Sequence, residues 1–190
     1  MAVQLAKKGV SVNLAKSLNN VLIGLGWDTA YNGGYDFDLD ASVFLVGANN
    51  KVTEEDDFVF YNNLIHPSES VEHTGDNRTG KGDGDDESIR VDLRKVPSHI
   101  EKIVITVTIH DAKKRAQNFG QVSNAFIRLV DESTGAENLR YDLTETFSTE
   151  TALIFAELYR NGRGWDFIAI GEGSTGDLFT LCEKYGVNAQ

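Results

Sequence analysis

The most chemically distinctive stretch of the sequence runs from Asp76 to Glu87 and reads Asp-Asn-Arg-Thr-Gly-Lys-Gly-Asp-Gly-Asp-Asp-Glu. Five carboxylates and three glycines within twelve residues cannot pack into an apolar core. The glycines let the chain turn sharply enough for several oxygen atoms to point at one place. The stretch therefore predicts a loop that binds a positively charged group.

A second acidic cluster lies earlier in the chain, where Asp36, Asp38 and Asp40 are spaced two apart at the start of an apolar segment, with Asp28 upstream. On an extended strand, alternate residues share one side at a spacing of about 6 to 7 Å. Like charges at that spacing repel each other unless a cation lies among them. We expect the two clusters to meet in space and to bind calcium; the alternative is that each is a solvated acidic surface.

The negative charge of the chain is concentrated in this region. The net charge is −11, and residues 28–87 carry 15 acidic and 3 basic side chains, whereas the remainder is nearly balanced. Concentrated negative charge repels a phosphate backbone and attracts cations, so the sequence argues against a nucleic-acid partner. Glu54 to Asp57 contains four adjacent acids without glycine, and we expect this run to be a solvated face.

The available ligands favour calcium over other ions. Carboxylate, amide and carbonyl oxygens select a hard cation, and magnesium is the weaker choice because it requires compact octahedral geometry. An EF-hand starting at Asp76 fails because Lys81 occupies the position that requires glycine, and the start at Asp36 fails because of Ala41. The site must then combine separate loops, with Asp83, Asp85 and Glu87 as one arm and Asp36, Asp38 and Asp40 as the other.

The elements that must position these loops are mostly strands. The clearest is 103–109, with β-branched residues throughout, and we expect it to be central. Residues 149–160 have helix-forming composition, but the turn at 161–164 favours a hairpin. Short helices are predicted at 112–119, with Asp111 as N-cap, and at 177–185. The other predicted strands are 10–14, 20–27, 37–46, 58–61, 71–74, 89–93, 125–130, 138–143, 152–159 and 165–170.

Together these elements predict an all-β fold, an antiparallel β-sandwich of about ten strands with a short helix after the central strand and a C-terminal helix. The length predicts a single domain over residues 1–190. No apolar run reaches the length of a transmembrane segment, and the N-terminus does not resemble a signal peptide, so a cytoplasmic location is expected. Cys182 is the only cysteine and is expected to be buried on a helix.

Catalytic signals are weak. His66, His73, His99 and His110 are scattered, and no zinc-protease, serine-hydrolase or phosphate-binding motif is present. His110 beside Asp111 resembles a catalytic dyad, but we interpret it as a structural histidine at a strand end. The sequence therefore predicts a protein that is not an enzyme, with a metal-dependent phosphoesterase as an alternative.

Eight segments of the chain together form a specific pattern. They are Gly24-Leu-Gly-Trp-Asp28, Phe37-Asp-Leu-Asp-Ala-Ser42, Tyr61-Asn-Asn63, His73-Thr-Gly-Asp-Asn-Arg-Thr-Gly80, Gly82-Asp-Gly-Asp-Asp-Glu87, Thr108-Ile-His-Asp111, Phe119-Gly-Gln-Val122 and Ala125-Phe-Ile-Arg128. These segments closely resemble the TerD family of tellurium-resistance and stress proteins. The resemblance implies a bacterial, calcium-binding β-sandwich with one or two Ca²⁺ ions. It also implies the metal ligands Asp28, Asp36, Asp38, Asp40, Asn62, Asp76, Asn77, Asp83, Asp85, Asp86 and Glu87.

The resemblance further implies a role in tellurium resistance and the stress response, acting with other Ter-type stress proteins near the inner membrane. We therefore expect a calcium-dependent interaction module in a Ter complex. An alternative is calcium-bridged docking of the same acidic loops on anionic lipid, as a peripheral membrane protein.

Overall fold

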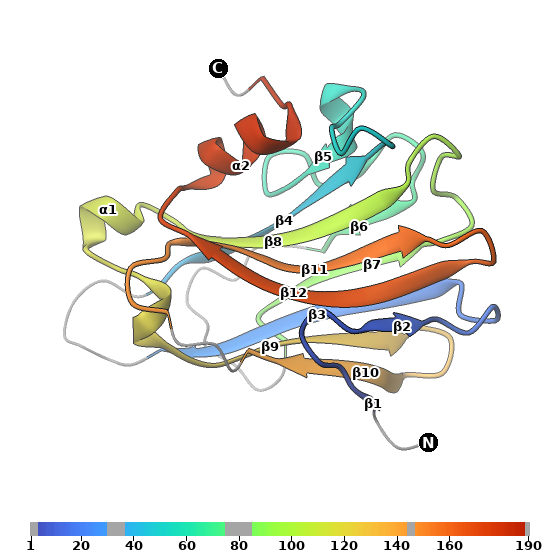
Figure 1. Ribbon diagram of the computed structural model, residues 1–190, viewed down its shortest axis with the longest axis horizontal. Helices are drawn as coiled ribbons and strands as arrows, with labels where there is room; N and C mark the ends of the chain where they lie inside the picture. The colour runs from blue at the N-terminus through green and yellow to red at the C-terminus, as the bar shows by residue number, and fades with distance from the viewer. Residues whose placement is uncertain (1–3, 30–36, 75–84, 144–146, 189–190) are drawn as a thin grey trace.

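Two six-stranded sheets face each other in the computed structural model, which describes residues 4–29, 37–74, 85–143 and 147–188 (Figure 1). The first sheet has the order β1-β10-β9-β3-β7-β6 and the second β2-β12-β11-β8-β4-β5. All described pairings between strands are antiparallel except that of β1 with β10. The predicted antiparallel sandwich is confirmed.

Eleven of the twelve described strands overlap strands predicted from the sequence, and β1 was not predicted. In the first sheet they are β1 Gln4–Leu5, β10 Ala136–Asp142, β9 Val122–Asp131, β3 Asn20–Thr29, β7 Glu87–Asp92 and β6 Val71–His73. In the second sheet they are β2 Ser11–Asn13, β12 Trp165–Ser174, β11 Ala152–Arg160, β8 Lys102–Ile109, β4 Leu39–Val46 and β5 Phe58–Val59. The ambiguous segment at 149–160 forms the strand of a hairpin, as predicted, and β8 lies inside its sheet between β11 and β4.

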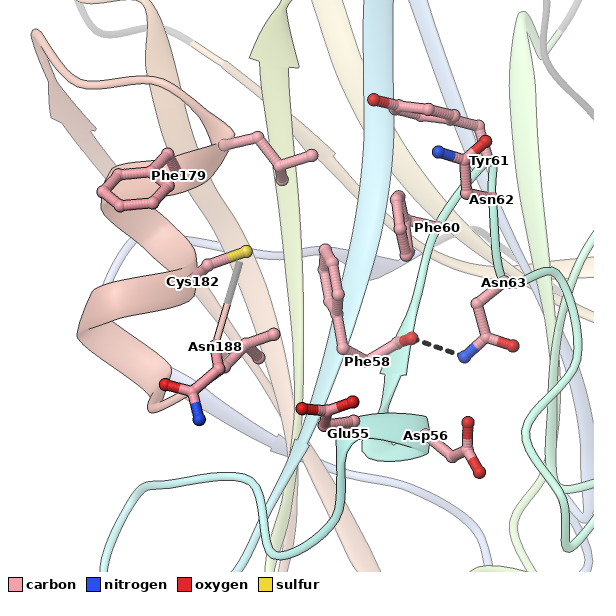
Figure 2. A pocket seen from close by; sticks show the side chains of 12 residues that line it. Glu55, Asp56, Phe58, Phe60, Tyr61, Asn62, Asn63, Phe179, Cys182 and Asn188 are labelled. Carbon is pink, nitrogen blue, oxygen red and sulfur yellow. Dashed lines mark hydrogen bonds between the residues drawn. The ribbon is translucent and has the colours of Figure 1, made fainter. Parts of the chain in front are cut away.

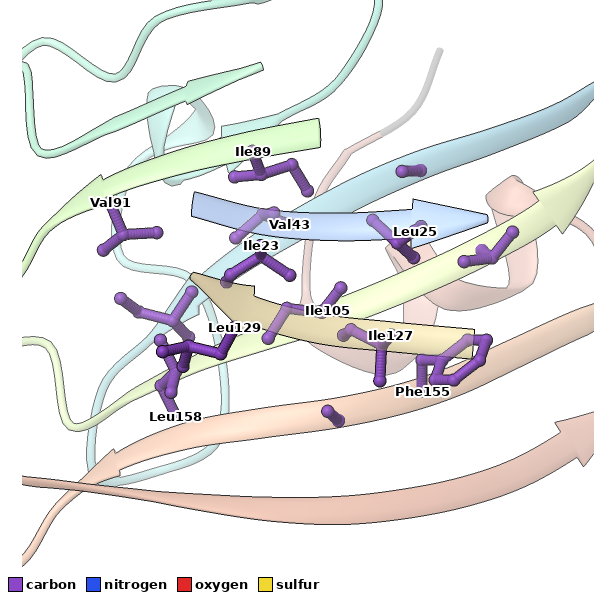
Figure 3. Close-up of a cluster of buried hydrophobic side chains, with 14 of the residues drawn as sticks. Ile23, Leu25, Val43, Ile89, Val91, Ile105, Ile127, Leu129, Phe155 and Leu158 are labelled. Carbon is purple, nitrogen blue, oxygen red and sulfur yellow. The ribbon is translucent and has the colours of Figure 1, made fainter. Parts of the chain in front are cut away.

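The main core lies between the two sheets (Figure 3). Inward-facing branched side chains alternate along β3, β7 and β9, and they meet those of β4, β8 and β11 from the opposite sheet. The labelled examples are Ile23, Leu25, Ile89, Val91, Ile127, Leu129, Val43, Ile105, Phe155 and Leu158, all buried.

A second, smaller core lies on the outer face of the second sheet, under helix α2 (Leu178–Tyr185). Phe44 stacks on Phe58 at a ring-centroid distance of 4.5 Å, and Tyr185 of α2 packs against Phe44 at 4.7 Å. Because both faces of β4 are covered, every residue from Leu39 to Val46 is buried. This explains why Phe44 and Val46 interrupt the alternation of apolar and polar residues in that strand.

The helical segments differ in part from expectation. Helix α1 spans only Ala112–Arg115 rather than 112–119, because Ala116 adopts a left-handed conformation with φ of 53°. Asp111 precedes it, but its side chain makes no capping bond, so the N-cap prediction is wrong for its side chain. Helix α2 begins after Asp177, which accepts from Thr180 N, and ends at Gly186 with φ of 82°, as predicted.

Two 3₁₀ turns complete the described structure, η1 at Glu55–Asp57 and η2 at Phe119–Gln121. The expectation of a solvated acidic face at 54–57 is wrong for Asp57, which is buried. Its carboxylate accepts bonds from Thr53 N and Glu54 N and contacts His66 Nε2 at 3.1 Å, so local hydrogen bonding compensates its burial. No helix within the described residues is long and apolar enough to cross a membrane.

Candidate functional site

The described acidic residues of the predicted metal site lie at one end of the sandwich. β3 runs antiparallel to β7 with Leu25 opposite Glu87, so Asp28 and the start of β7 lie at the same end of the first sheet. In the second sheet, Asp40 is opposite Thr108, next to the last residue of β8. Strand order therefore places the acidic starts of β4 and β7 and the acidic end of β3 near each other.

Glu87 joins the two sheets directly at this end. Its Oε2 atom accepts a hydrogen bond from Ala41 N on β4 at a distance of 2.5 Å. β5 pairs with β4 only at Val43 and Phe44, so Ala41 N–H lies beyond the end of β5, and the Glu87 carboxylate replaces a strand carbonyl there. The buried His73 lies nearby, with its Nε2 atom 3.6 Å from the same oxygen.

An arginine and a histidine side chain face the acidic start of β4. Arg115 Nη1 lies 3.5 Å from Asp38 Oδ2, and His110 Nδ1 lies 3.6 Å from Asp40 Oδ2. Both carboxylates are buried, at 5% and 8% exposure. Buried carboxylates need such compensation, and the short helix α1 supplies it by carrying Arg115 over the strand end.

Asp85 is held by an arginine and a glycine from neighbouring strands. Arg128 on β9 donates from Nε and Nη2 to its two oxygens at 2.8 and 3.0 Å, and the bond to Asp85 is the main reason that the pKa of Arg128 is raised. A Cβ atom on Gly24 would lie 2.1 Å from Asp85 Oδ2. The carboxylate thus packs in the space that a side chain at position 24 of β3 would fill, and a glycine inside a strand is the sequence signal for such close packing.

Asp86 lies in a locally negative environment. Burial raises the pKa of Asp86, and repulsion from Asp28 and Asp85 raises it further. The hydrogen bond from Trp27 N to Asp86 Oδ2, at 2.9 Å, lowers the pKa but does not outweigh these effects. Asp28 itself accepts from Asn124 Nδ2 at 2.7 Å. Three carboxylates from β3 and the approach to β7 therefore influence each other at this end.

The structure brings together Asp28, Asp85 and Asp86 at one end of the first sheet, and it joins Glu87 to β4, which carries Asp40 and directly follows Asp38. Asp36, Asp76, Asn77 and Asp83 lie outside the described residues. Asn62 is placed elsewhere, in a pocket between β5 and α2. Among the described residues, no three histidine, cysteine or acidic side chains form a group that could hold a metal ion.

Sequence reasoning missed the partners of these acids, His73, Arg115 and Arg128. Arg128 had a detectable signal, since it is a basic residue between the buried Ile127 and Leu129 of β9 and must leave the strand on the outer face. His73 and Arg115 had none, because their roles depend on how the strands meet.

Comparisons with known proteins agree with this fold. The TerD domain family model matches residues 1–185. The chain is 62% identical to the uncharacterized protein YceE of Bacillus subtilis (strain 168), covering 98% of this chain and 99% of that protein. It is 56% identical to the tellurium resistance protein TerD of Serratia marcescens over the full length of both chains. It is 53% identical to general stress protein 16U of Bacillus subtilis (strain 168), over 98% of each.

Two solved structures share the fold at lower identity. A crystal structure of a protein of unknown function matches with a TM-score of 0.74 and 22% identity, covering 92% of this chain and all of that chain. A homologue of telluride resistance protein (TerD) from Streptomyces coelicolor A3(2) matches with a TM-score of 0.70 and 24% identity, covering 86% of this chain and 95% of that chain. From the family model and the full-length relatives, this chain belongs to the TerD domain family of tellurium-resistance and general stress proteins.

Proposed function

We propose that this protein is a calcium-binding, non-catalytic stress-response protein whose acidic end binds one or two Ca²⁺ ions. The observation that supports the proposal most directly is the hydrogen bond from Ala41 N to Glu87, because it holds the acidic segments 38–40 and 85–87 at the same end of the fold. Two acidic segments about 46 residues apart in sequence would not be packed together in a protein that merely used them for solubility.

The chemistry of the donors fits a hard divalent cation. The candidate side chains offer carboxylate and amide oxygens, without thiolates, which suits Ca²⁺. The raised pKa of Asp86 shows that its charge is not fully compensated by its surroundings. A bound cation would supply that compensation and would order the carboxylates that repel one another.

The proposed ligands are divided between two groups. Asp28 and Asp86 belong to the described residues, and Asp36, Asp76, Asn77 and Asp83 belong to the segments that follow β3 and precede β7. Asp38, Asp40 and Asp85 are already in contact with His110, Arg115 or Arg128, so we assign them mainly to positioning the ends of the strands. This division is part of the proposal and is what mutagenesis must test.

Calorimetric titration of metal-stripped protein with calcium is the direct test. We expect saturable binding with a stoichiometry of one or two. Binding to the native state at 100 times the Kd adds about 2.7 kcal/mol. For a chain of this length, roughly 2 to 4 °C per kcal/mol translates this into a rise in Tm of about 5 to 11 °C.

The matched variants are D86N, which removes a proposed ligand charge, and E101Q, which removes an exposed carboxylate at the start of β8, the opposite end from His110. D86N should weaken calcium binding, whereas E101Q should bind like the wild type. Magnesium should bind more weakly than calcium in the same titration. The proposal is refuted if the titration gives no heat of binding and millimolar calcium leaves the Tm unchanged.

The proposed role for the ion is to create an interaction surface for other Ter-type stress proteins, near the inner membrane. Co-purification from cells in calcium and in EDTA tests this part. Partners recovered equally under both conditions would contradict a calcium-dependent module while leaving calcium binding itself intact.

A further inference from the structure

A pocket of about 440 Å³ lies between η1, the segment that follows β5, and α2. Figure 2 shows Phe58 and Phe60 on one side of it and Cys182 and Phe179 of α2 on the other. Its volume lies within the range of small-molecule sites, which are mostly apolar with a few polar groups at defined places. Apart from Asn62, it contains no member of the predicted calcium set.

Aromatic rings form one wall of the pocket. Phe58 and Phe60 are stacked at a centroid distance of 4.4 Å, and Tyr61 meets Phe60 edge to face at 5.0 Å. Opposite them, Cys182 is buried, and burial raises the pKa of its thiol to about 11, so this wall is uncharged at neutral pH. Phe179 is 51% exposed and Tyr61 37%, so two aromatic side chains border the opening. These surfaces favour an apolar, preferably planar, body.

The charge of the pocket has one sign. Glu55 and Asp56 both line it, and Figure 2 shows Glu55 beside Phe58. No lysine, arginine or histidine lies among the lining residues, and within the described part of the chain neither carboxylate has an ion-pair partner. Aromatic rings and carboxylates both attract cations, so the electrostatics favour a positively charged ligand.

Both walls are fixed in place before any ligand binds. Asp57 anchors η1 through bonds from Thr53 N and Glu54 N and through its contact with His66. α2 is attached at its C-terminal end, where Lys51 Nζ donates to Lys184 O at 2.6 Å. A pre-formed site loses less conformational entropy on binding than one that must be assembled.

We propose that this pocket binds a small organic cation, a protonated amine carried on an aromatic or branched apolar body. The apolar body lies between the phenylalanine rings and α2, and the ammonium group lies toward Glu55 and Asp56. This inference is independent of calcium, since it uses the opposite face of the second sheet from the main core and a different set of residues.

The test is an NMR titration of the full chain, in EDTA and again in calcium, with tryptamine, phenethylamine and isoamylamine as probes. Indole-3-propionate is the matched anion for tryptamine. We expect saturable shifts of backbone amides around Phe58, Tyr61 and Cys182 for at least one amine, and at least tenfold weaker binding of the anion. Binding of the amine and the anion with equal affinity would overturn the assignment of a cation, and the absence of pocket shifts for all three amines would overturn the site.

Substitutions separate the contribution of charge to amine binding from that of apolar contact. E55Q should weaken amine binding about threefold, the effect of one partly exposed ion pair, whereas the control E101Q makes the same change of charge away from the pocket and should have no effect. F179A should weaken amine and anion alike because it removes apolar contact without changing charge. Since Phe179 and Glu55 are exposed, both variants should keep the wild-type Tm within about 2 °C. Equal effects of E55Q and E101Q would contradict the proposed place of the ammonium group.

Discussion

The bond between Glu87 and Ala41 N gives a sharp test of how the acidic end is held together. Glu87 is 2% exposed, accepts from Ala41 N at 2.5 Å and lies 3.6 Å from His73 Nε2. We compare E87Q with E87A. Glutamine keeps an acceptor for Ala41 N–H but loses the charge. Alanine removes the acceptor, so that Ala41 N–H loses its hydrogen bond to residue 87 and His73 loses its contact with the Glu87 carboxylate.

The magnitudes follow from these contacts. Replacing a charge-assisted hydrogen bond by a neutral one costs about 1 kcal/mol, so E87Q should lower Tm by roughly 2 to 4 °C. E87A leaves a buried donor unsatisfied and opens a small cavity, which together cost about 3 to 4 kcal/mol, or roughly 6 to 16 °C. The control is E72Q on β6, whose side chain is 44% exposed and pairs loosely with Arg90 at 3.5 Å, and it should change Tm by less than about 2 °C.

The assay is thermal unfolding by circular dichroism, in EDTA and in calcium. If the Glu87 side chain stabilises the contact between the sheets, then in EDTA E87A should have the lowest Tm, E87Q an intermediate Tm and the wild type the highest. If E87Q is as unstable as E87A in EDTA, or if neither differs from the wild type, the reasoning about Ala41 is refuted. A calcium-induced rise in Tm that is lost in E87Q would show that the charge of Glu87 also contributes to ion binding.

Three further predictions concern single residues. G24A places a Cβ atom on the carboxylate of Asp85 and forces that carboxylate away from Arg128. The variant should therefore be about 1 to 3 kcal/mol less stable in denaturant unfolding, and the double variant G24A/D85G should recover part of this loss. In metal-free protein, the pKa of Asp86 is raised, so the folded state binds the proton of this carboxyl group more tightly than the unfolded state does. The contribution of Asp86 to stability therefore falls as the pH rises from the ordinary pKa of 3.8 through the raised pKa. D86N should flatten that part of the profile of stability against pH, and an unchanged profile would contradict the raised pKa of Asp86. Cys182, with its pKa raised to about 11, should resist iodoacetamide at pH 8 in native protein and react once it is unfolded; rapid native labelling would contradict its burial.

The fold was predictable from local patterns because most strands obey a period of two. The β-branched run of β8 indicated an interior strand, and it lies between β11 and β4. The lengths of helices were less predictable, since α1 ends at Ala116 through a backbone conformation that nothing in Ala112 to Gly120 signals. Propensity over eight residues is a weak guide when the connection is constrained by contacts such as that of Arg115 with Asp38.

The sequence predicted that acidic residues from separate segments meet at one end of the fold, but it did not predict the side chains that contact them. Acid spacing and glycine content pointed to Asp28, Asp86 and their neighbours, whereas Asn62 lies in the pocket beside α2 because the chain after β5 turns back on itself, with Phe60 and Asn63 exchanging backbone bonds. Asp57 was expected in solvent because four consecutive acids look alike in a sequence. Only one of them faces His66, and that selection is made by tertiary contacts.

The small aromatic core beneath α2 has a consequence for how the molecule opens. Phe44, Phe58 and Tyr185 make contacts that the interior between the sheets does not share, so α2 has its own, smaller free energy of detachment. Amide hydrogens of α2 should therefore exchange with deuterium through sub-global opening, well before those of β8 and β3. Because α2 forms one wall of the aromatic pocket, a ligand bound there should slow this exchange while leaving that of β8 and β3 unchanged.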